Sequence, residues 1–160
     1  MKTLSIRLAV ICLLFTPYLH AAEPLAPWGS ATEIQQKYSK QKVVYDTTSG
    51  SLSGLTSVLD RVSYLSQLNG ADPFDTKIVI VLHGKAIPFF AIKNFAKYKN
   101  LMIRAQSLSV GGVIEFRMCK AAARLQGFTA KDIHGFIKMV PMADAEIVRL
   151  QQEEGFAYMR

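Results

Sequence analysis

The run KIVIVLH at residues 77–83 constrains the fold more than any other part of the sequence. Between Lys77 and His83 every residue is apolar, and the first four of these residues alternate isoleucine with valine. β-Branched side chains favour an extended strand over a helix. Because no polar residue interrupts the run, we expect a strand covered on both faces, as at the centre of a parallel sheet.

Short apolar runs and helical spacings alternate along the rest of the chain. Leu52, Leu55 and Leu59 follow a period of about 3.6 residues, which predicts a helix after the first strand. Helix-length segments between strands favour parallel pairing with right-handed crossovers. We therefore predict a three-layer α/β/α domain with a mostly parallel sheet of four to five strands. The predicted strands are 42–46, 77–82, 113–118, 136–140 and a closing edge strand at 156–159; the predicted helices are 52–65, two stretches within 89–110, 119–126, and one from about 143 to near 155.

The first 21 residues are typical of a secretory signal peptide. Lys2 and Arg7 precede a short apolar run, and Ala21 and Ala22 are small enough for cleavage. We therefore expect an exported protein, periplasmic or secreted. The predicted division is a signal peptide at 1–21, an extended lead-in at 22–41 with one helical turn near 32–38, and a single domain at 42–160.

Composition and spacing argue against several kinds of function. No later apolar stretch approaches the roughly 20 residues of a membrane span, so none is expected in the mature chain. The formal net charge is +7, but the basic residues are scattered, which disfavours nucleic-acid binding. The histidines show no metal-ligand spacing, and SGSLSG (49–54) lacks the residues of a phosphate-binding loop. No metal and no cofactor are therefore predicted.

Cys119 has two interpretations. Cleavage would remove Cys12 and leave Cys119 without an intrachain disulfide partner. An unpaired cysteine is often a small buried hydrophobe, but it can also be a reactive thiolate. Cys119 follows the predicted strand 113–118 and begins a helix, where unpaired amide N–H groups favour negative charge. The nearby cations that would support a thiolate are Arg117, Lys120 and Arg124.

His83 is a second candidate at the same edge of the predicted sheet. It closes the strand at 77–82, and Gly84 then breaks the run into a loop. Ligands of open parallel sheets bind outside the carboxyl ends of the strands. If strands 77–82 and 113–118 are neighbours, His83 and Cys119 share one rim. His83 is then either a hydrogen-bonded structural residue or a proton-transfer or pocket-lining residue.

Two smaller patterns complete the predictions. In strand 113–118, Glu115 and Arg117 lie on one face, so this strand is expected to be partly covered or to meet another subunit. Thr129 followed by Asp132 has the spacing of a capping box. His134, in the following turn, is interpreted as a solvated loop histidine.

Three segments carry a resemblance to a known family. They are KIVIVLHGKAIPFF (77–90), GGVIEFRMCKAAARLQGF (111–128) and IKMVPMADAEIVRLQQEEGFAYM (137–159). Over about residues 42–160 the chain resembles the DsrE/DsrF-like proteins, specifically their secreted single-domain branch. The stretch CKAAARLQG, which begins at Cys119, is similar to the segment around the sulfur-carrying cysteine of DsrE and TusD sulfur-relay subunits.

The resemblance implies a flavodoxin-like domain, assembly into homo- or hetero-oligomers such as trimers or hexamers, and a cysteine that carries sulfane sulfur as a persulfide. Only Cys119 carries over as a catalytic residue; His83, Gly84, Lys120 and Arg124 are supporting or pocket residues. The relay members work in the cytoplasm with carrier proteins, whereas this chain is expected to be exported, so its sulfur donor and acceptor stay open.

The resulting prediction is an exported sulfur carrier that passes sulfur from Cys119 to a thiol acceptor. Whether it acts as a sulfurtransferase enzyme is left open. The alternative is a non-catalytic oligomeric periplasmic binding or scaffold module in which Cys119 is buried and structural. A redox sensor is a third interpretation, but the mature chain would lack a resolving cysteine.

Overall fold

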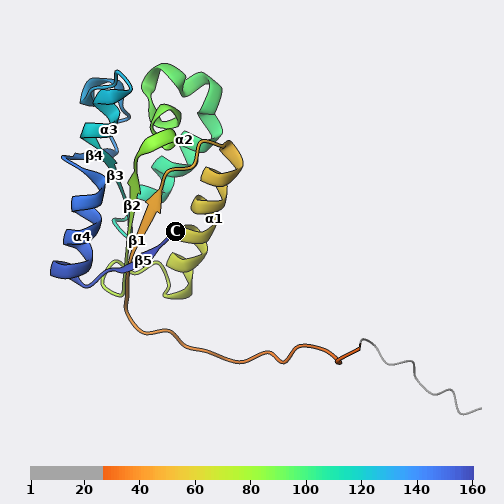
Figure 1. Ribbon diagram of the computed structural model, residues 1–160. Helices are drawn as coiled ribbons and strands as arrows, with labels where there is room; N and C mark the ends of the chain where they lie inside the picture. The colour runs from red at the N-terminus through yellow and green to blue at the C-terminus, as the bar shows by residue number, and fades with distance from the viewer. Residues whose placement is uncertain (1–26) are drawn as a thin grey trace, which may run out of the picture. The chain divides into compact units, whose positions relative to one another are not determined.

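The computed structural model describes residues 27–160 (Figure 1). The predicted signal peptide at 1–21 lies outside the described residues. Residues 36–160 form one compact unit, and residues 27–40 are extended with exposed side chains. The helical turn predicted near 32–38 is wrong, because a single turn without packing partners does not offset the cost of ordering its backbone.

The core of the domain is a five-stranded, all-parallel sheet in the order β4-β3-β2-β1-β5. The KIVIVL run forms the central strand, as predicted, and its residues 78–82 are at most 1% exposed. Helices on both faces exclude water from this strand, which explains why it tolerates no polar interior residue. The strands are β1 (Gln41–Thr47), β2 (Thr76–Leu82), β3 (Ile114–Cys119), β4 (Ile137–Val140) and β5 (Ala157–Met159).

The α-helices are α1 (Leu52–Leu68), α2 (Phe95–Ser109), α3 (Lys120–Leu125) and α4 (Ala143–Glu154). Figure 1 shows α1 and α2 on one face of the sheet and α4 on the other. The chain therefore has the predicted three-layer, flavodoxin-like α/β/α fold. None of the helices within residues 27–160 combines the length and the apolar character that crossing a membrane requires.

Strand side chains alternate between two apolar clusters, one on each face of the sheet. The larger cluster lies against α1 and α2 and contains fully buried residues such as Phe116 and Met102. The smaller cluster lies against α4, and Cys119 belongs to it. The buried members of the smaller cluster are Val44, Val79, Val81, Cys119, Ala143, Ile147, Leu150 and Phe156.

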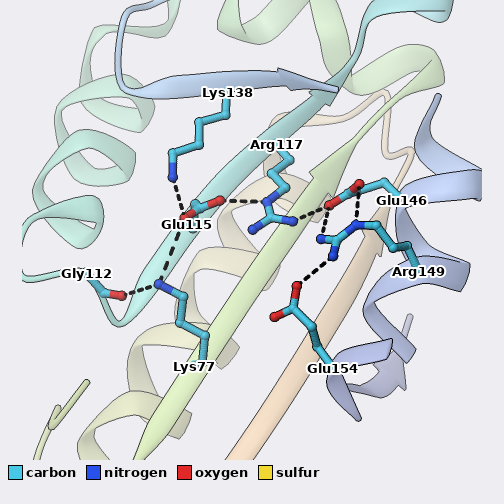
Figure 2. A network of polar contacts seen from close by, with 8 residues as sticks. All are labelled: Lys77, Gly112, Glu115, Arg117, Lys138, Glu146, Arg149 and Glu154. Atoms are coloured by element: carbon cyan, nitrogen blue, oxygen red, sulfur yellow. Dashed lines mark hydrogen bonds and ion pairs between the residues drawn. The ribbon is translucent and has the colours of Figure 1, made fainter. Parts of the chain in front are cut away.

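The charged face of β3 takes part in an ion network with α4 (Figure 2). Arg117 donates to Glu115 at 2.6 Å and also pairs with Glu146 on α4. Lys138 donates to Glu115 at 2.8 Å, and Arg149 donates to Glu146 at 2.8 Å. The side chains of Glu115 and Arg117 are only 14% and 15% exposed, so ion pairs within this chain cover the part of β3 that was predicted to be partly covered or to meet another subunit.

Burial raises the pKa of Glu115, but the hydrogen bonds donated by Lys138 and Arg117 lower it more, and the pKa lies below its usual value. The carboxylate therefore stays charged at neutral pH. Removing one partner of such a half-buried network would leave another charge without compensation. The network thus fixes α4 against β3, beside the small apolar cluster that contains Cys119.

After β2 the sequence predicts a loop and then two helical stretches separated near residues 99–100; the separation is confirmed, but the loop is partly helical. A 3₁₀ segment, Gly84–Phe90, comes first, because in an α-helix the ring of Pro88 would clash with the carbonyl group four residues before it. A second 3₁₀ turn, Ile92–Asn94, leads into α2. The break lies inside α2 at Tyr98, whose φ of −117° and ψ of 25° are not helical.

The interpretation of His134 as a solvated residue is wrong. Its ring lies near two aromatic rings, with centroids 5.6 Å from Phe95 and 6.1 Å from Phe136. Its Nε2 atom is buried and has no hydrogen-bond partner among the described residues. Burial lowers the pKa of His134, so the neutral imidazole is favoured.

Three local predictions are confirmed. The predicted capping box is present, with the backbone N–H of Thr129 donating to the Asp132 carboxylate at 2.7 Å, and Thr129 Oγ1 donates to the same carboxylate at 2.7 Å. Gly155 ends α4 in a left-handed conformation with φ 72°. The closing strand lies at the edge of the sheet beside β1.

A matched pair of glycine substitutions tests the loop that follows β2. Gly84 has φ +54°, and an added Cβ would make only ordinary contact with Thr48 at 3.7 Å. Gly84→Ala should therefore lower the free energy of unfolding by roughly 1–2 kcal/mol through backbone strain alone. Gly135 has no atom within 4 Å of an added Cβ and no positive φ, so Gly135→Ala should change stability by less than about 1 kcal/mol. Urea denaturation measures both; equal effects would contradict this description of the loop.

Candidate functional site

Parallel pairing brings the carboxyl ends of the strands to one rim of the sheet. In the β2–β3 pair, Leu82 lies opposite Met118. His83 and Cys119 are the next residues on these two strands, and both follow the side-chain alternation toward the α4 face. The two candidate residues therefore start side by side at the rim.

Cys119 is both the last residue of β3 and the N-cap of α3. Its Sγ accepts a hydrogen bond from the backbone N–H of Ala122 at 3.4 Å. The residue is only 4% exposed and lies in the small apolar cluster against α4. The sulfur atom is thus both buried and hydrogen-bonded to a backbone amide. The structure therefore has one feature expected of a buried hydrophobe and one expected of a reactive thiolate.

The cations predicted around Cys119 differ in their availability. Arg117 is engaged by Glu115 and Glu146, so its charge is already compensated. Lys120 and Arg124 are exposed on α3 and form no ion pair within the described part of the chain. Only these two of the three remain free to attract an anion to this end of the sheet.

His83 lies just beyond β2 in an extended conformation, as the residue before the 3₁₀ segment. Its Nε2 is 2.5 Å from Oδ1 of Asp46 on β1. The other oxygen of Asp46 accepts a hydrogen bond from the hydroxyl of Tyr158 on β5, at 2.7 Å. The structure therefore places His83 in a His83–Asp46–Tyr158 cluster that spans three strands.

The carboxylate of Asp46 is held in its charged form. Burial raises its pKa, but hydrogen bonds from His83 and Tyr158 outweigh this effect, and the pKa lies below its usual value. The same contact with Asp46 raises the pKa of the Tyr158 hydroxyl. A carboxylate bound to one ring nitrogen holds an imidazole in one orientation. His83 thus has the support that a proton-transfer residue needs.

Gly84 connects the two rim loops through its backbone. The side-chain amide of Gln126, just after α3, donates to the carbonyl oxygen of Gly84 at 2.8 Å. This hydrogen bond ties the loop after β2 to the helix that Cys119 begins. Gly84 is thus a structural link at the rim.

Sequence reasoning missed three residues of this site: Asp46, Tyr158 and Gln126. For Asp46 the sequence held one signal: it is the last residue of the first predicted strand, and strand ends form the rim where ligands bind. Tyr158 lies 112 residues from Asp46 in the sequence, and only the β1–β5 pairing brings them together. Gln126 depends likewise on the spatial approach of α3 to the loop after β2.

Five hollows of about 230 to 540 Å³ on the described surface are not lined by Cys119 or His83. The largest of them lies between α1 and α2. Within residues 27–160, no three side chains of histidine, cysteine or acidic type gather closely enough to hold a metal ion.

Comparisons with known proteins support the fold only. No protein-family model and no curated protein matches the chain. Among solved structures, the chain is similar to a protein of unknown function, MTH1491 from Methanobacterium thermoautotrophicum, with a TM-score of 0.58 and 20% sequence identity. The match covers 76% of this chain and 99% of that chain. At this level of identity the similarity concerns the arrangement of helices and strands and carries no activity.

The carboxylate of Asp46 should stabilise the fold in a pH-dependent way. Because its folded-state pKa is lowered, its contribution is fully present above the unfolded value of about 3.9 and is lost as the pH falls through the folded value. Asp46→Asn should lower the free energy of unfolding by about 1–3 kcal/mol at neutral pH.

Urea denaturation at neutral and strongly acidic pH measures this difference, which should shrink in acid. Tyr158→Phe removes one of the two donors and should have a smaller effect of the same kind. If Asp46→Asn lowers the free energy of unfolding by the same amount at both pH values, Asp46 contributes through packing and not through its charge.

Proposed function

We propose that this protein is an exported sulfur carrier of the DsrE/DsrF-like type, which accepts sulfane sulfur as a persulfide on Cys119 and passes it to an acceptor thiol. The observation that carries the proposal is the hydrogen bond from the Ala122 N–H to Sγ, at the rim of an all-parallel sheet. The resemblance of the stretch CKAAARLQG to sulfur-carrying segments supports the same residue.

The hydrogen bond from the Ala122 N–H is stronger when Sγ carries a negative charge. Hydrogen bonds to ionised acceptors are about twice as strong as those between neutral groups. The N–H of Ala122 therefore stabilises a thiolate, whose charge lies on Sγ, more than a thiol. Because α3 has only six residues, this direct contact matters more than the dipole of the helix.

The presence of a cysteine at the N-cap of α3 also favours a reactive role for Cys119 over a structural one. Serine, threonine, aspartate and asparagine are the preferred N-caps because oxygen is a good acceptor, whereas sulfur is a weak one. Alanine or valine would suit an apolar cluster without placing an unpaired thiol in an oxidising compartment. Sulfur transfer would use both features of this position, the amide contact and the burial.

With thiosulfate as donor, the Cys119 thiolate attacks the outer sulfur atom. A sulfur–sulfur bond to Cys119 forms, and the bond to the sulfite group breaks, so that sulfite leaves with the electron pair. An acceptor thiolate then attacks the terminal sulfur and releases Cys119 as a thiolate. His83, oriented by Asp46 and adjacent to Cys119 in the strand register, can take the proton of the thiol.

The low exposure of Cys119 favours a second candidate, the non-catalytic oligomeric binding or scaffold module. With 4% of its surface exposed and aliphatic neighbours, Cys119 could serve only to fill the space beside α4. The two functions differ in whether a reagent reaches the sulfur of the folded protein.

Sulfur loading tests the carrier function directly. The purified full chain, treated with thiosulfate or polysulfide, should gain the mass of one sulfur atom on the peptide that contains Cys119, and a thiol acceptor should remove it. Cys119→Ser keeps a capping side chain of similar size and should gain nothing. Absence of the added mass, while a known carrier protein is loaded in parallel, would disprove the proposal.

Thiol labelling separates the two candidates. For a carrier, a small alkylating reagent should modify Cys119 of the folded protein at neutral pH, and Lys120→Gln together with Arg124→Gln should slow modification by a negatively charged reagent more than by a neutral one. For a structural cysteine, labelling should need denaturant. Mass spectrometry of the Cys119 peptide over time measures both rates.

A further inference from the structure

We infer that the hollow between α1 and α2 binds a small organic anion with an apolar body, such as an aryl phosphate. The hollow has a volume of about 540 Å³, within the usual range of small-molecule sites. It lies on the α1/α2 side of the sheet, whereas Cys119 faces α4. The inference is therefore independent of sulfur transfer.

The interruption of α2 at Tyr98 shapes the hollow. Residues 96–101 all line it, although a regular helix of 3.6 residues per turn points six consecutive side chains in all directions. The non-helical dihedral angles of Tyr98 turn the first part of α2 relative to the second. Both parts can thus contribute to one concave surface opposite the start of α1.

The floor and one wall of the hollow are apolar. Leu101 is 5% exposed and belongs to the large apolar cluster. The ring of Tyr98 packs on the buried Phe89, with ring centroids 4.4 Å apart, so it forms a fixed surface. Leu52, at the first position of α1, is half exposed and forms the wall. These groups can accommodate an aromatic or aliphatic body.

The charged groups of the hollow are all positive. Lys97, Lys99 and Arg104 line it, and none of the lining residues is acidic. Arg104 is paired with Asp60 at 2.6 Å, but Lys97 and Lys99 form no ion pair within residues 27–160. The Lys97 ammonium lies 5.2 Å from the centre of the Tyr98 ring, which holds a cation directly beside an apolar surface.

The charge and the apolar lining together select the class of ligand. Inorganic phosphate would use the lysines but leave Leu52 and Tyr98 in contact with water. A neutral aromatic would use the apolar surface but leave the two unpaired lysines without a counter-charge. The start of α1 adds no opposing charge, because its first turn has no acidic residue. An organic anion satisfies both parts of the site.

Three probes test the inference on the full chain: 1-naphthyl phosphate, 1-naphthol and inorganic phosphate. In a heteronuclear NMR titration, 1-naphthyl phosphate should bind saturably and at least about tenfold more tightly than either other probe. The largest amide shifts should fall on residues 52–56 and 96–104. Equal affinities for the three probes, or shifts that map elsewhere, would overturn the inference.

A double variant, Lys97→Gln with Lys99→Gln, should lower the affinity for 1-naphthyl phosphate to about that for 1-naphthol. Both lysines are exposed, and circular dichroism should confirm that the variant is folded. Lys131→Gln is the control, because Lys131 is exposed and does not line the hollow. An equal loss of affinity in the control, or an unchanged affinity in the double variant, would contradict the assignment of the site.

Discussion

The direct passage of β3 into α3 at Cys119 determines what the candidate site can do. As the last strand residue, Cys119 turns its side chain toward α4 and into an apolar cluster. As the N-cap, it brings Sγ to the amide of Ala122. Burial would protect a persulfide from water and oxidants, and the amide would stabilise the thiolate that attacks the sulfur donor. The same junction limits access to Sγ, so a sulfur donor for the proposed carrier would have to approach along the rim of the sheet.

The two faces of the sheet have different chemistry. On the α4 face, charged side chains cover β3, and the cluster of Asp46, His83 and Tyr158 lies at the rim (Figure 2 shows the β3–α4 network). The last strand of the chain completes that cluster, because β5 brings Tyr158 beside β1. On the opposite face a large apolar core supports α1 and α2, and the kink at Tyr98 opens a cationic hollow between them.

Much of the fold could be predicted from local sequence patterns, because a strand buried on both faces of a sheet is an uninterrupted run of apolar residues. The run at 77–82 predicted the central strand, and Thr129 with Asp132 predicted a cap, since both depend on neighbouring residues. The site was predicted only where strand ends indicated it. The other two members of the His83 cluster, Asp46 and Tyr158, lie 37 and 75 residues from His83 in the sequence, and no local pattern encodes such pairings.

The amide resonance of Ala122 gives the most direct test of the central claim, that sulfane sulfur is held on Cys119 against the first turn of α3. After treatment of the full chain with polysulfide, the account predicts that the amide resonance of Ala122 shifts, because Sγ, which accepts its hydrogen bond, becomes bonded to a second sulfur atom. The shift should be absent in the Cys119→Ser protein. An Ala122 resonance that stays unchanged at saturating polysulfide would contradict the account and leave Cys119 as a packing residue.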